Sequence, residues 1–316
     1  MVKTLSRANY PDLPSYPERM IQFGEGNFMR AFVEWQLQQM NKQGLFNGSA
    51  VLIKPRNRGL GPRLDDQDYL YTVLINGIMQ QQLVNDREII TSVSRLINPY
   101  TQYDDFLQLA ENDELEFITS NTTEAGIAYD PEDRLDNGPQ KSFPGKLTAL
   151  LYRRFELGKK GFTIIPCELI DRNGEKLKEI VCRYGQEWNL GEAFLNWLDE
   201  DNLFCCSLVD RIVPGYPHDK AAELEQELGY EDKYMVMAEP FLLWIIEGPE
   251  WLKERLPLAK AGLNVRVTQD MTPYRERKVH LLNGPHTAMV PLGLLAGLET
   301  VEEVMTDPSF SRFVIC

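Results

Sequence analysis

Short apolar runs rich in β-branched residues alternate with longer amphipathic segments along most of this chain. The short runs have the length and composition of buried strands and occupy residues 20–23, 49–53, 115–120 and 161–166. The longer segments space their apolar residues as helices do and occupy residues 106–112, 146–157, 177–188 and 191–199. This alternation predicts an α/β fold with a doubly wound, mostly parallel sheet.

Three further patterns complete the predicted organisation. The strand-like runs 71–75 and 89–93 lie around the dipeptide Asn76-Gly77, a strong former of tight turns, so we expect a hairpin turn there. Residues 207–213 have the composition of another strand. From about Met271 the apolar spacing becomes helical and stays so to the end, which predicts a second, helical part of the chain.

A Gly-x-Gly turn follows the first of these strands. Gly24-Glu25-Gly26 comes directly after the apolar run 20–23 and is followed by apolar residues at helical spacing. In a strand-turn-helix of this kind, the first glycine permits the tight turn and the second lets a pyrophosphate approach the backbone. Met29 stands where the usual third glycine would be. The pattern indicates a dinucleotide site, with an ordinary strand-to-helix turn as the alternative.

The residues after the second strand bear on the choice of dinucleotide. An Asp or Glu usually stands there and accepts hydrogen bonds from the ribose hydroxyls. This chain has Lys54-Pro55-Arg56 instead. Because a basic residue at this place could meet a 2′-phosphate, the sequence leaves the choice between NAD and NADP open.

The segment from Lys278 to His286 places an amine, an amide and an imidazole among apolar neighbours. If it is helical, Lys278, Asn283 and His286 fall within an arc of about 140°. Such groups suit a carbonyl being reduced or an alcohol being oxidised, since Lys can carry the proton and Asn can donate to a developing oxyanion. Pro285 interrupts the pattern, so we expect a kink at Gly284 or a new helix with Pro285 in its first turn.

Composition narrows the class of protein. The formal net charge of −14 argues against nucleic-acid binding and implies that an anionic ligand is met by a local cationic pocket. No apolar run approaches the roughly 18 residues of a membrane span, and no signal peptide precedes the first strand, so we expect a cytoplasmic protein. The five cysteines lack metal-ligand spacing and there are only three histidines, so no metal site is expected.

The C-terminal segment ends abruptly. Residues 308–316 have the pattern of a helix whose apolar face is still being built, and no cap or polar tail follows. The sequence therefore predicts a truncated chain, and it leaves the oligomeric state open.

Four segments resemble the mannitol dehydrogenase family, also called the polyol-specific long-chain dehydrogenases. They are residues 21–32, 120–127, 166–174, and 209–212 taken together with 278–286. The sequences Asn-Thr-Thr-Glu-Ala-Gly at 121–126 and Cys-Glu-Leu-Ile at 167–170 resemble the tagaturonate branch of the family more than the mannitol and fructuronate branches. The resemblance implies a Rossmann-type NAD-binding domain over 1–265 and the N-terminal part of a helical substrate-binding domain over 266–316.

The resemblance also implies an activity, an NAD-dependent interconversion of D-tagaturonate and D-altronate in hexuronate catabolism without a metal. Lys278 matches the family's general acid and base, Asn173 and Asn283 its two donors to the substrate oxygen, and His286 its partner for a substrate hydroxyl. The expected cofactor contacts are Gly24, Gly26, Asn27, Phe28, Arg30, Asn121, Thr122 and Glu124.

A hexuronate brings a carboxylate that needs a cation. Arg275, one turn before Lys278, is the first candidate because arginine binds carboxylates in a bidentate geometry, and Arg30 and Arg172 follow it. Three alternatives stay open: a fructuronate reductase, a dehydrogenase of mannitol or another polyol, and a chain that binds NAD without turnover because it lacks the rest of the helical domain.

Overall fold

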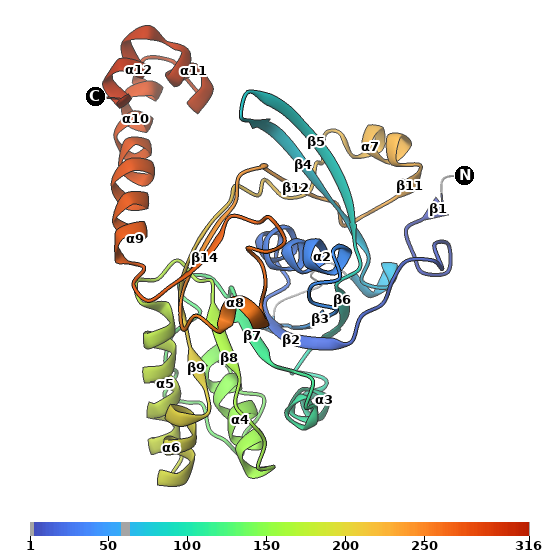
Figure 1. The fold of residues 1–316 in the computed structure, drawn as a ribbon, viewed down its shortest axis with the longest axis vertical. Helices are drawn as coiled ribbons and strands as arrows, with labels where there is room; N and C mark the ends of the chain where they lie inside the picture. The colour runs from blue at the N-terminus through green and yellow to red at the C-terminus, as the bar shows by residue number, and fades with distance from the viewer. Residues whose placement is uncertain (1–2, 58–63, 316) are drawn as a thin grey trace. The chain divides into compact units, whose positions relative to one another are not determined.

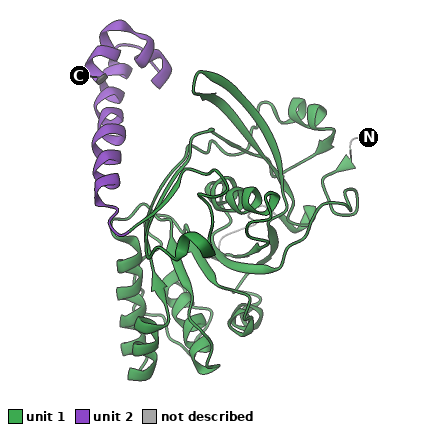
Figure 2. Ribbon diagram, viewed as in Figure 1, with its two compact units in different colours: residues 1–268 green, residues 269–316 purple. Residues whose placement is uncertain are grey.

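The computed structural model describes residues 3–57 and 64–315, and these residues form two compact units. Residues 1–268 belong to the first unit and residues 269–316 to the second (Figure 2). The first unit holds the sheets, and the second is helical in its described part.

The first unit is built on a six-stranded sheet in which every pairing is parallel (Figure 1). In spatial order the strands are β6 (Val93–Ile97), β3 (Ser49–Ile53), β2 (Glu18–Phe23), β7 (Phe117–Ser120), β8 (Thr163–Pro166) and β9 (Leu203–Phe204). The chain runs outward from β2 to β6, then returns to β7 on the other side of β2. The strand order therefore reverses between β2 and β7, which is where ligands bind in open α/β sheets.

Helices cover both faces of this sheet. They are α1 (Asn27–Met29), the π-helical segment η1 (Arg30–Glu34), α2 (Trp35–Lys42), α3 (Tyr103–Gln108), α4 (Phe143–Glu156), α5 (Asn173–Glu187) and α6 (Glu192–Glu200). Successive strand residues enter different cores: Met20 packs in one apolar cluster and Ile21 in the other. All of β3 is buried, as in a strand covered on both sides. The predicted doubly wound, mostly parallel sheet is confirmed.

The remaining strands form three small sheets. The hairpin β4 (Tyr71–Met79) and β5 (Gln82–Ile90) is joined by β12 (Val236–Ala238). A second sheet holds β10 (Cys206–Asp210), β13 (Leu243–Glu247) and β14 (Val265–Thr268), and a third holds β1 (Lys3–Thr4) and β11 (Tyr230–Glu231). The short helices α7 (Ala221–Leu228) and α8 (Leu252–Arg255) lie between strands of these sheets along the chain.

The hairpin corrects one prediction. Its turn lies at Gln80-Gln81, both with positive φ (51° and 64°), and Asn76-Gly77 is part of the ladder, with Gly77 opposite Val84. A side chain at Gly77 would place its Cβ 2.8 Å from the Pro240 ring, so this glycine permits a close approach from a distant segment.

The second unit consists of α9 (Thr272–Lys278), the π-helical segment η4 (Val279–Asn283), α10 (Gly284–Leu295), α11 (Val301–Thr306) and α12 (Pro308–Ile315). Pro285 lies in the first turn of α10, as in the second of the two arrangements expected for this proline. However, α10 is not a separate new helix: the Gly284 N–H donates to the Val279 carbonyl, five residues back, so the π-helical turn joins α9 to α10 without a break.

Lys146 of α4 is a buried cation that ties the segment after β3 to the helix. Its ammonium donates to the Pro55 carbonyl at 3.2 Å, and to the Tyr100 hydroxyl and the Lys141 carbonyl at 3.0 Å. Burial lowers the pKa of Lys146 from 10.5 to about 8. Because the unfolded chain then binds this proton more tightly than the folded one, Lys146 should make the free energy of unfolding rise as pH rises from about 8 to 10.5.

We therefore predict that Lys146→Met removes a pH-dependent part of the stability. The unfolding free energy of the unmodified chain minus that of the variant should grow between pH 7.5 and pH 10, by no more than about 3 kcal/mol. Denaturant unfolding at both pH values measures it. Lys176→Met, at an exposed lysine of α5, is the control and should give a constant difference. A constant difference for Lys146→Met would contradict the prediction.

Candidate functional site

A cleft of about 420 Å³ lies at the carboxyl ends of β2, β3 and β7. Its lining residues are Gly24, Glu25, Gly26, Asn27, Arg30, Lys54, Pro55, Arg56, Asn121, Thr122 and Thr123. Six of the eight predicted cofactor residues are among them. The other two lie outside the lining: Phe28 stacks on Phe32, with ring centroids 4.8 Å apart, and Glu124 is exposed.

The Gly-x-Gly turn fits this cleft for steric reasons. Gly24 has φ +110°, and a Cβ on it would lie 2.7 Å from the Asn121 carbonyl oxygen. The ends of the strands are bonded on both sides, since Gly24 N–H donates to Ile53 and Asn121 N–H donates to Phe23, each at 3.0 Å. A Cβ on Gly26 would meet nothing within 4 Å, so that backbone faces open space where a phosphate can approach.

The buried carboxylate of Glu34 supports the Gly-x-Gly turn through Gln22. Gln22 of β2 donates to the Gly24 carbonyl at 2.8 Å and to Glu34 at 2.6 Å, and Tyr71 of β4 also donates to Glu34. Glu34 is fully buried at the end of η1, and burial raises its pKa. Gln22 and Glu34 were not among the residues predicted from the sequence, although a polar residue inside an apolar strand was a usable signal.

Arg30 is oriented by neighbours on two elements. Its guanidinium donates to the Tyr234 carbonyl at 2.7 Å and to the Asn27 side chain. It also lies 5.3 Å from the centre of the Tyr71 ring. These contacts hold a positive charge in the cleft wall.

A second buried carboxylate, Glu168, holds the opposite wall. It is 2% exposed and accepts hydrogen bonds from the Ser120 hydroxyl at 3.0 Å and from both the N–H and the hydroxyl of Thr122 at 2.9 Å. Burial raises the pKa of Glu168 in spite of these donors. Since Thr122 lines the cleft, Glu168 sets the path of the backbone there.

Asn173 lies at the start of α5 with its side chain fully buried. Its amide nitrogen donates to the carbonyls of Pro166, Glu168 and Ser207, each at 3.0 Å. Its amide oxygen accepts from the N–H groups of Gly174 and Ser207, each at 2.9 Å. The Asn173 amide therefore links three segments: the end of β8, the start of α5 and β10.

The other three predicted catalytic residues lie together in the second unit, around η4. Lys278 is the last residue of α9, Asn283 the last of η4, and His286 lies in the first turn of α10. In a π-helical turn the hydrogen bonds join residues five apart, so Lys278 and Asn283 lie closer to one face than an α-helix would put them. The arc of about 140° expected for a regular α-helix therefore does not apply to this segment.

His286 has a defined tautomer in its neutral form. Its Nδ1 lies 2.8 Å from the Leu282 carbonyl oxygen. A carbonyl only accepts hydrogen bonds, so Nδ1 carries the hydrogen and Nε2 keeps its lone pair. His286 can therefore accept a hydrogen bond from a hydroxyl through Nε2.

The candidate carboxylate-binding arginines differ in their surroundings. Arg275 is half-buried in α9. Arg172 donates to Glu175 at 2.9 Å and to both oxygens of Glu247 at 2.9 and 2.7 Å.

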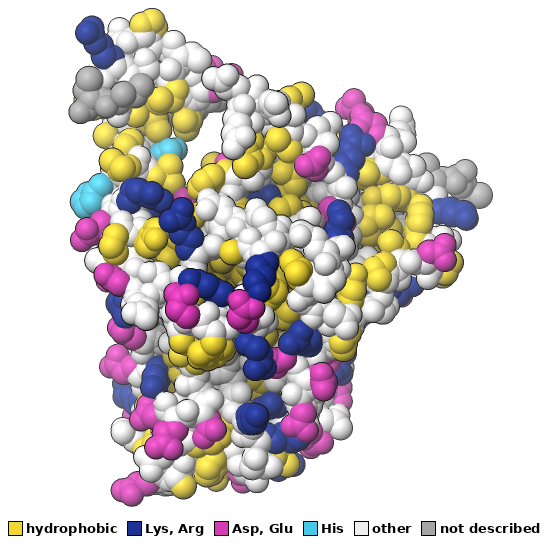
Figure 3. All heavy atoms as spheres, in the orientation of Figure 1, with side chains coloured by type: hydrophobic (Ala, Val, Ile, Leu, Met, Phe, Trp, Pro, Cys, Tyr) yellow, Lys and Arg dark blue, Asp and Glu magenta, His cyan; other side chains and the backbone are white. Residues whose placement is uncertain are grey.

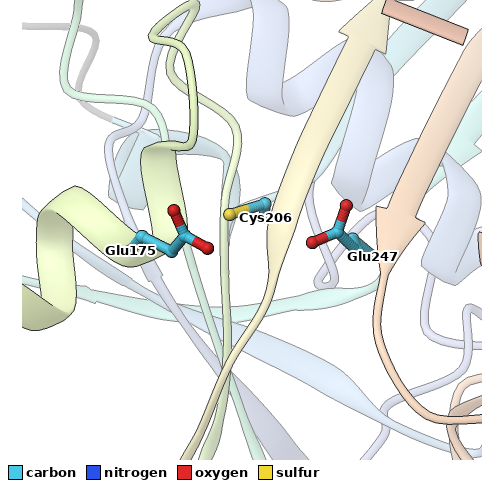
Figure 4. A group of neighbouring side chains, drawn as sticks. All are labelled: Glu175, Cys206 and Glu247. Atoms are coloured by element: carbon cyan, nitrogen blue, oxygen red, sulfur yellow. The ribbon is translucent and has the colours of Figure 1, made fainter. Parts of the chain in front are cut away.

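Figure 4 shows that Glu175, Cys206 and Glu247 come from three different elements and lie near one another. Their ligand atoms lie within 4.8 Å of one another, but the positive charge beside the carboxylates is supplied by Arg172.

The charges around the cleft differ from those of the whole chain. Acidic and basic side chains are intermixed on the face shown in Figure 3, and the chain carries a net charge of −14. Among the residues that line the cleft, Arg30, Lys54 and Arg56 face one carboxylate, Glu25. The cleft is thus a local cationic site of the kind that the acidic composition requires of an anion-binding protein.

Comparison with known proteins gives matches along the whole chain. The family model described as mannitol dehydrogenase Rossmann domain matches residues 18–260, and the model described as mannitol dehydrogenase C-terminal domain matches residues 270–315. Two proteins named altronate oxidoreductase are similar over 99% of this chain: 48% identical in Bacillus subtilis (strain 168) and 51% in Escherichia coli O7:K1 (strain IAI39). The chain spans 66% of the length of these relatives.

Two solved structures share the fold. The ternary complex of Pseudomonas fluorescens mannitol 2-dehydrogenase with NAD and D-mannitol is 25% identical with a TM-score of 0.78, over 99% of this chain and 67% of that one. A substrate-free D-sorbitol dehydrogenase has 20% identity and a TM-score of 0.81, over 98% and 68%. None of the helices in the described parts of the chain combines the length and apolar character needed to cross a membrane.

The Glu168 contacts generate a stability prediction. Glu168→Ala should lower the free energy of unfolding by about 1–3 kcal/mol, because the buried Thr122 N–H loses its acceptor. Glu168→Gln should cost less, since its amide oxygen still accepts. Denaturant unfolding at pH 7 measures both. Glu179→Ala, at an exposed carboxylate of α5, is the control, expected within about 0.5 kcal/mol of the unmodified chain. Equal stabilities for the Glu168→Ala and Glu179→Ala variants would refute the assignment.

Proposed function

The chain belongs to the mannitol dehydrogenase family, and on that premise we propose that it interconverts D-tagaturonate and D-altronate with NAD as the redox partner, in the breakdown of hexuronates. The observation that carries the proposal is the cleft at the reversal point of the sheet, together with relatives about half identical in sequence that are named altronate oxidoreductase. The mannitol 2-dehydrogenase complex with NAD supports the cofactor.

The backbone and the charges of the cleft support a dinucleotide as its ligand. Gly24 lets the strand ends come together, and the open backbone at Gly26 leaves room for a pyrophosphate. Arg30 and Lys54 bring positive charge to the same cleft. When bound, NADH supplies the hydride for reduction of the keto group, and NAD takes it back in the reverse direction.

The proposed chemistry of the chain's own residues concerns one proton and one oxygen. Lys278 protonates the keto oxygen as the carbonyl is reduced and removes the proton in reverse. Asn283 donates its amide N–H to that oxygen as negative charge develops. His286 accepts a hydrogen bond from a substrate hydroxyl through Nε2, which its bond to Leu282 leaves available.

Asn173 enters this proposal in a different way. The resemblance gives it the same donor role as Asn283, but its amide hydrogens are bonded to three backbone carbonyls. It can donate to the substrate only by exchanging one of those acceptors for the substrate oxygen. We therefore propose that Asn173 also positions the corner between β8 and α5.

The activity is tested by following NADH oxidation at 340 nm with tagaturonate, fructuronate and fructose supplied separately. We expect turnover with tagaturonate, and a loss of about 10²–10⁴-fold in kcat for Lys278→Ala, because the general acid is removed. Lys176→Ala, at an exposed lysine of α5, should leave kcat unchanged. NADH binding without turnover of any substrate would instead support the alternative of a chain that binds the cofactor without catalysis.

The carboxylate partner has its own test. Arg275→Met should raise KM for tagaturonate by about 10-fold or more, since a charge-assisted hydrogen bond is lost, and should change KM for fructose far less. Arg277→Met is a matched control two residues along α9, at an exposed arginine. Equal effects of Arg275→Met on both substrates, or equal effects of the two variants, would exclude Arg275 from this role.

A further inference from the structure

Among the described residues that line the cleft, no carboxylate stands directly after β3, where the usual acceptor for a ribose diol lies. In dinucleotide-binding sheets a carboxylate after the second strand accepts hydrogen bonds from the ribose hydroxyls and discriminates against a 2′-phosphate. Here β3 ends at Ile53, and Lys54, Pro55 and Arg56 follow it into the cleft. By composition alone, the segment 54–56 would favour NADP, because its two cations could bind the 2′-phosphate.

Both cations of this edge already act on groups of the protein. Arg56 donates to the Thr122 carbonyl at 3.3 Å and to the Thr123 hydroxyl at 3.1 Å, across the cleft from β3 to the loop after β7. The charge of Lys54 acts on Glu25, as does that of Arg30. A 2′-phosphate would have to compete with these oxygens for the cations.

Glu25 is the one carboxylate among the described residues that line the cleft. It is the middle residue of the Gly-x-Gly turn and is half-buried. The backbone beside it is fixed, because Gln22 and Ile53 bond to Gly24. An acceptor on a backbone held in this way meets a donor without rearrangement of the turn.

We propose that Glu25 replaces the missing carboxylate after β3: it accepts hydrogen bonds from the adenosine ribose hydroxyls and thereby selects NAD over NADP. The inference rests on the proposed function, because it concerns the cofactor of the same site. A ribose diol donates to the carboxylate and leaves the contacts of Lys54 and Arg56 in place. A 2′-phosphate meets a like charge at Glu25, which disfavours it.

The test is equilibrium binding of NADH and of NADPH to the purified chain, followed by cofactor fluorescence, so it does not depend on turnover. We expect the unmodified chain to bind NADH at least about 10-fold more tightly than NADPH. Glu25→Gln should reduce that ratio about 10-fold, because NADH loses a charged acceptor and NADPH loses a like-charge repulsion. Glu25→Asp, which keeps the charge, should retain most of the discrimination.

Controls separate this inference from the proposed function. Glu179→Gln, at an exposed carboxylate far along α5, should leave both dissociation constants unchanged, and thermal unfolding checks that each variant is folded. Preference of the unmodified chain for NADPH, or an unchanged ratio in folded Glu25→Gln, would overturn the role of Glu25 alone. Failure of the unmodified chain to bind either cofactor would overturn the proposed cofactor and this inference with it.

Discussion

The close approach of Gly24 to the Asn121 carbonyl determines the geometry of the cleft at the carboxyl ends of β2, β3 and β7. Residues at the ends of β2 and β7 can come this near only because no Cβ lies between them. The β2 to β7 pairing and the hydrogen bonds from Gly24 to Ile53 and from Asn121 to Phe23 then fix three strand ends at one place. The reversal of strand order opens the crevice at this same place, so a single backbone contact sets both the turn and the mouth of the site.

Two buried carboxylates maintain the walls on either side of that contact. Glu34 acts through Gln22 on the Gly24 carbonyl, and Glu168 acts on the N–H and hydroxyl of Thr122. Burial raises the pKa of both, which shows that their charged forms are poorly solvated. Each carboxylate satisfies donors that the folded chain buries, and through them it fixes the backbone on one side of the cleft.

Local pattern was sufficient for the sheet but not for the contacts between distant segments. Strands buried on both faces are continuous apolar runs in the sequence, so β2, β3, β7 and β8 could be predicted. The two edge strands of the six-stranded sheet, β6 and β9, are only partly buried and were not predicted. The hairpin turn was misplaced because Gly77 is required by Pro240, far along the chain. In the same way, β10 has strand composition, but its antiparallel partner β13 is set by tertiary structure. The five bonds of Asn173 need three segments to meet, which no local spacing encodes.

The charge of the cleft differs in sign from the net charge of the whole chain. A chain with a net charge of −14 repels an anion at long range, so the proposed function requires Arg30, Lys54 and Arg56 to attract the cofactor at short range, inside a partly enclosed cleft. Unopposed, three cations would attract any polyphosphate without discrimination. The role that we propose for Glu25 changes this, because one carboxylate in the turn leaves the cleft net positive for a pyrophosphate while placing a negative charge on one side of it. Affinity and selectivity then come from different residues of one cleft, with the cations binding charge and the carboxylate distinguishing a hydroxyl from a phosphate.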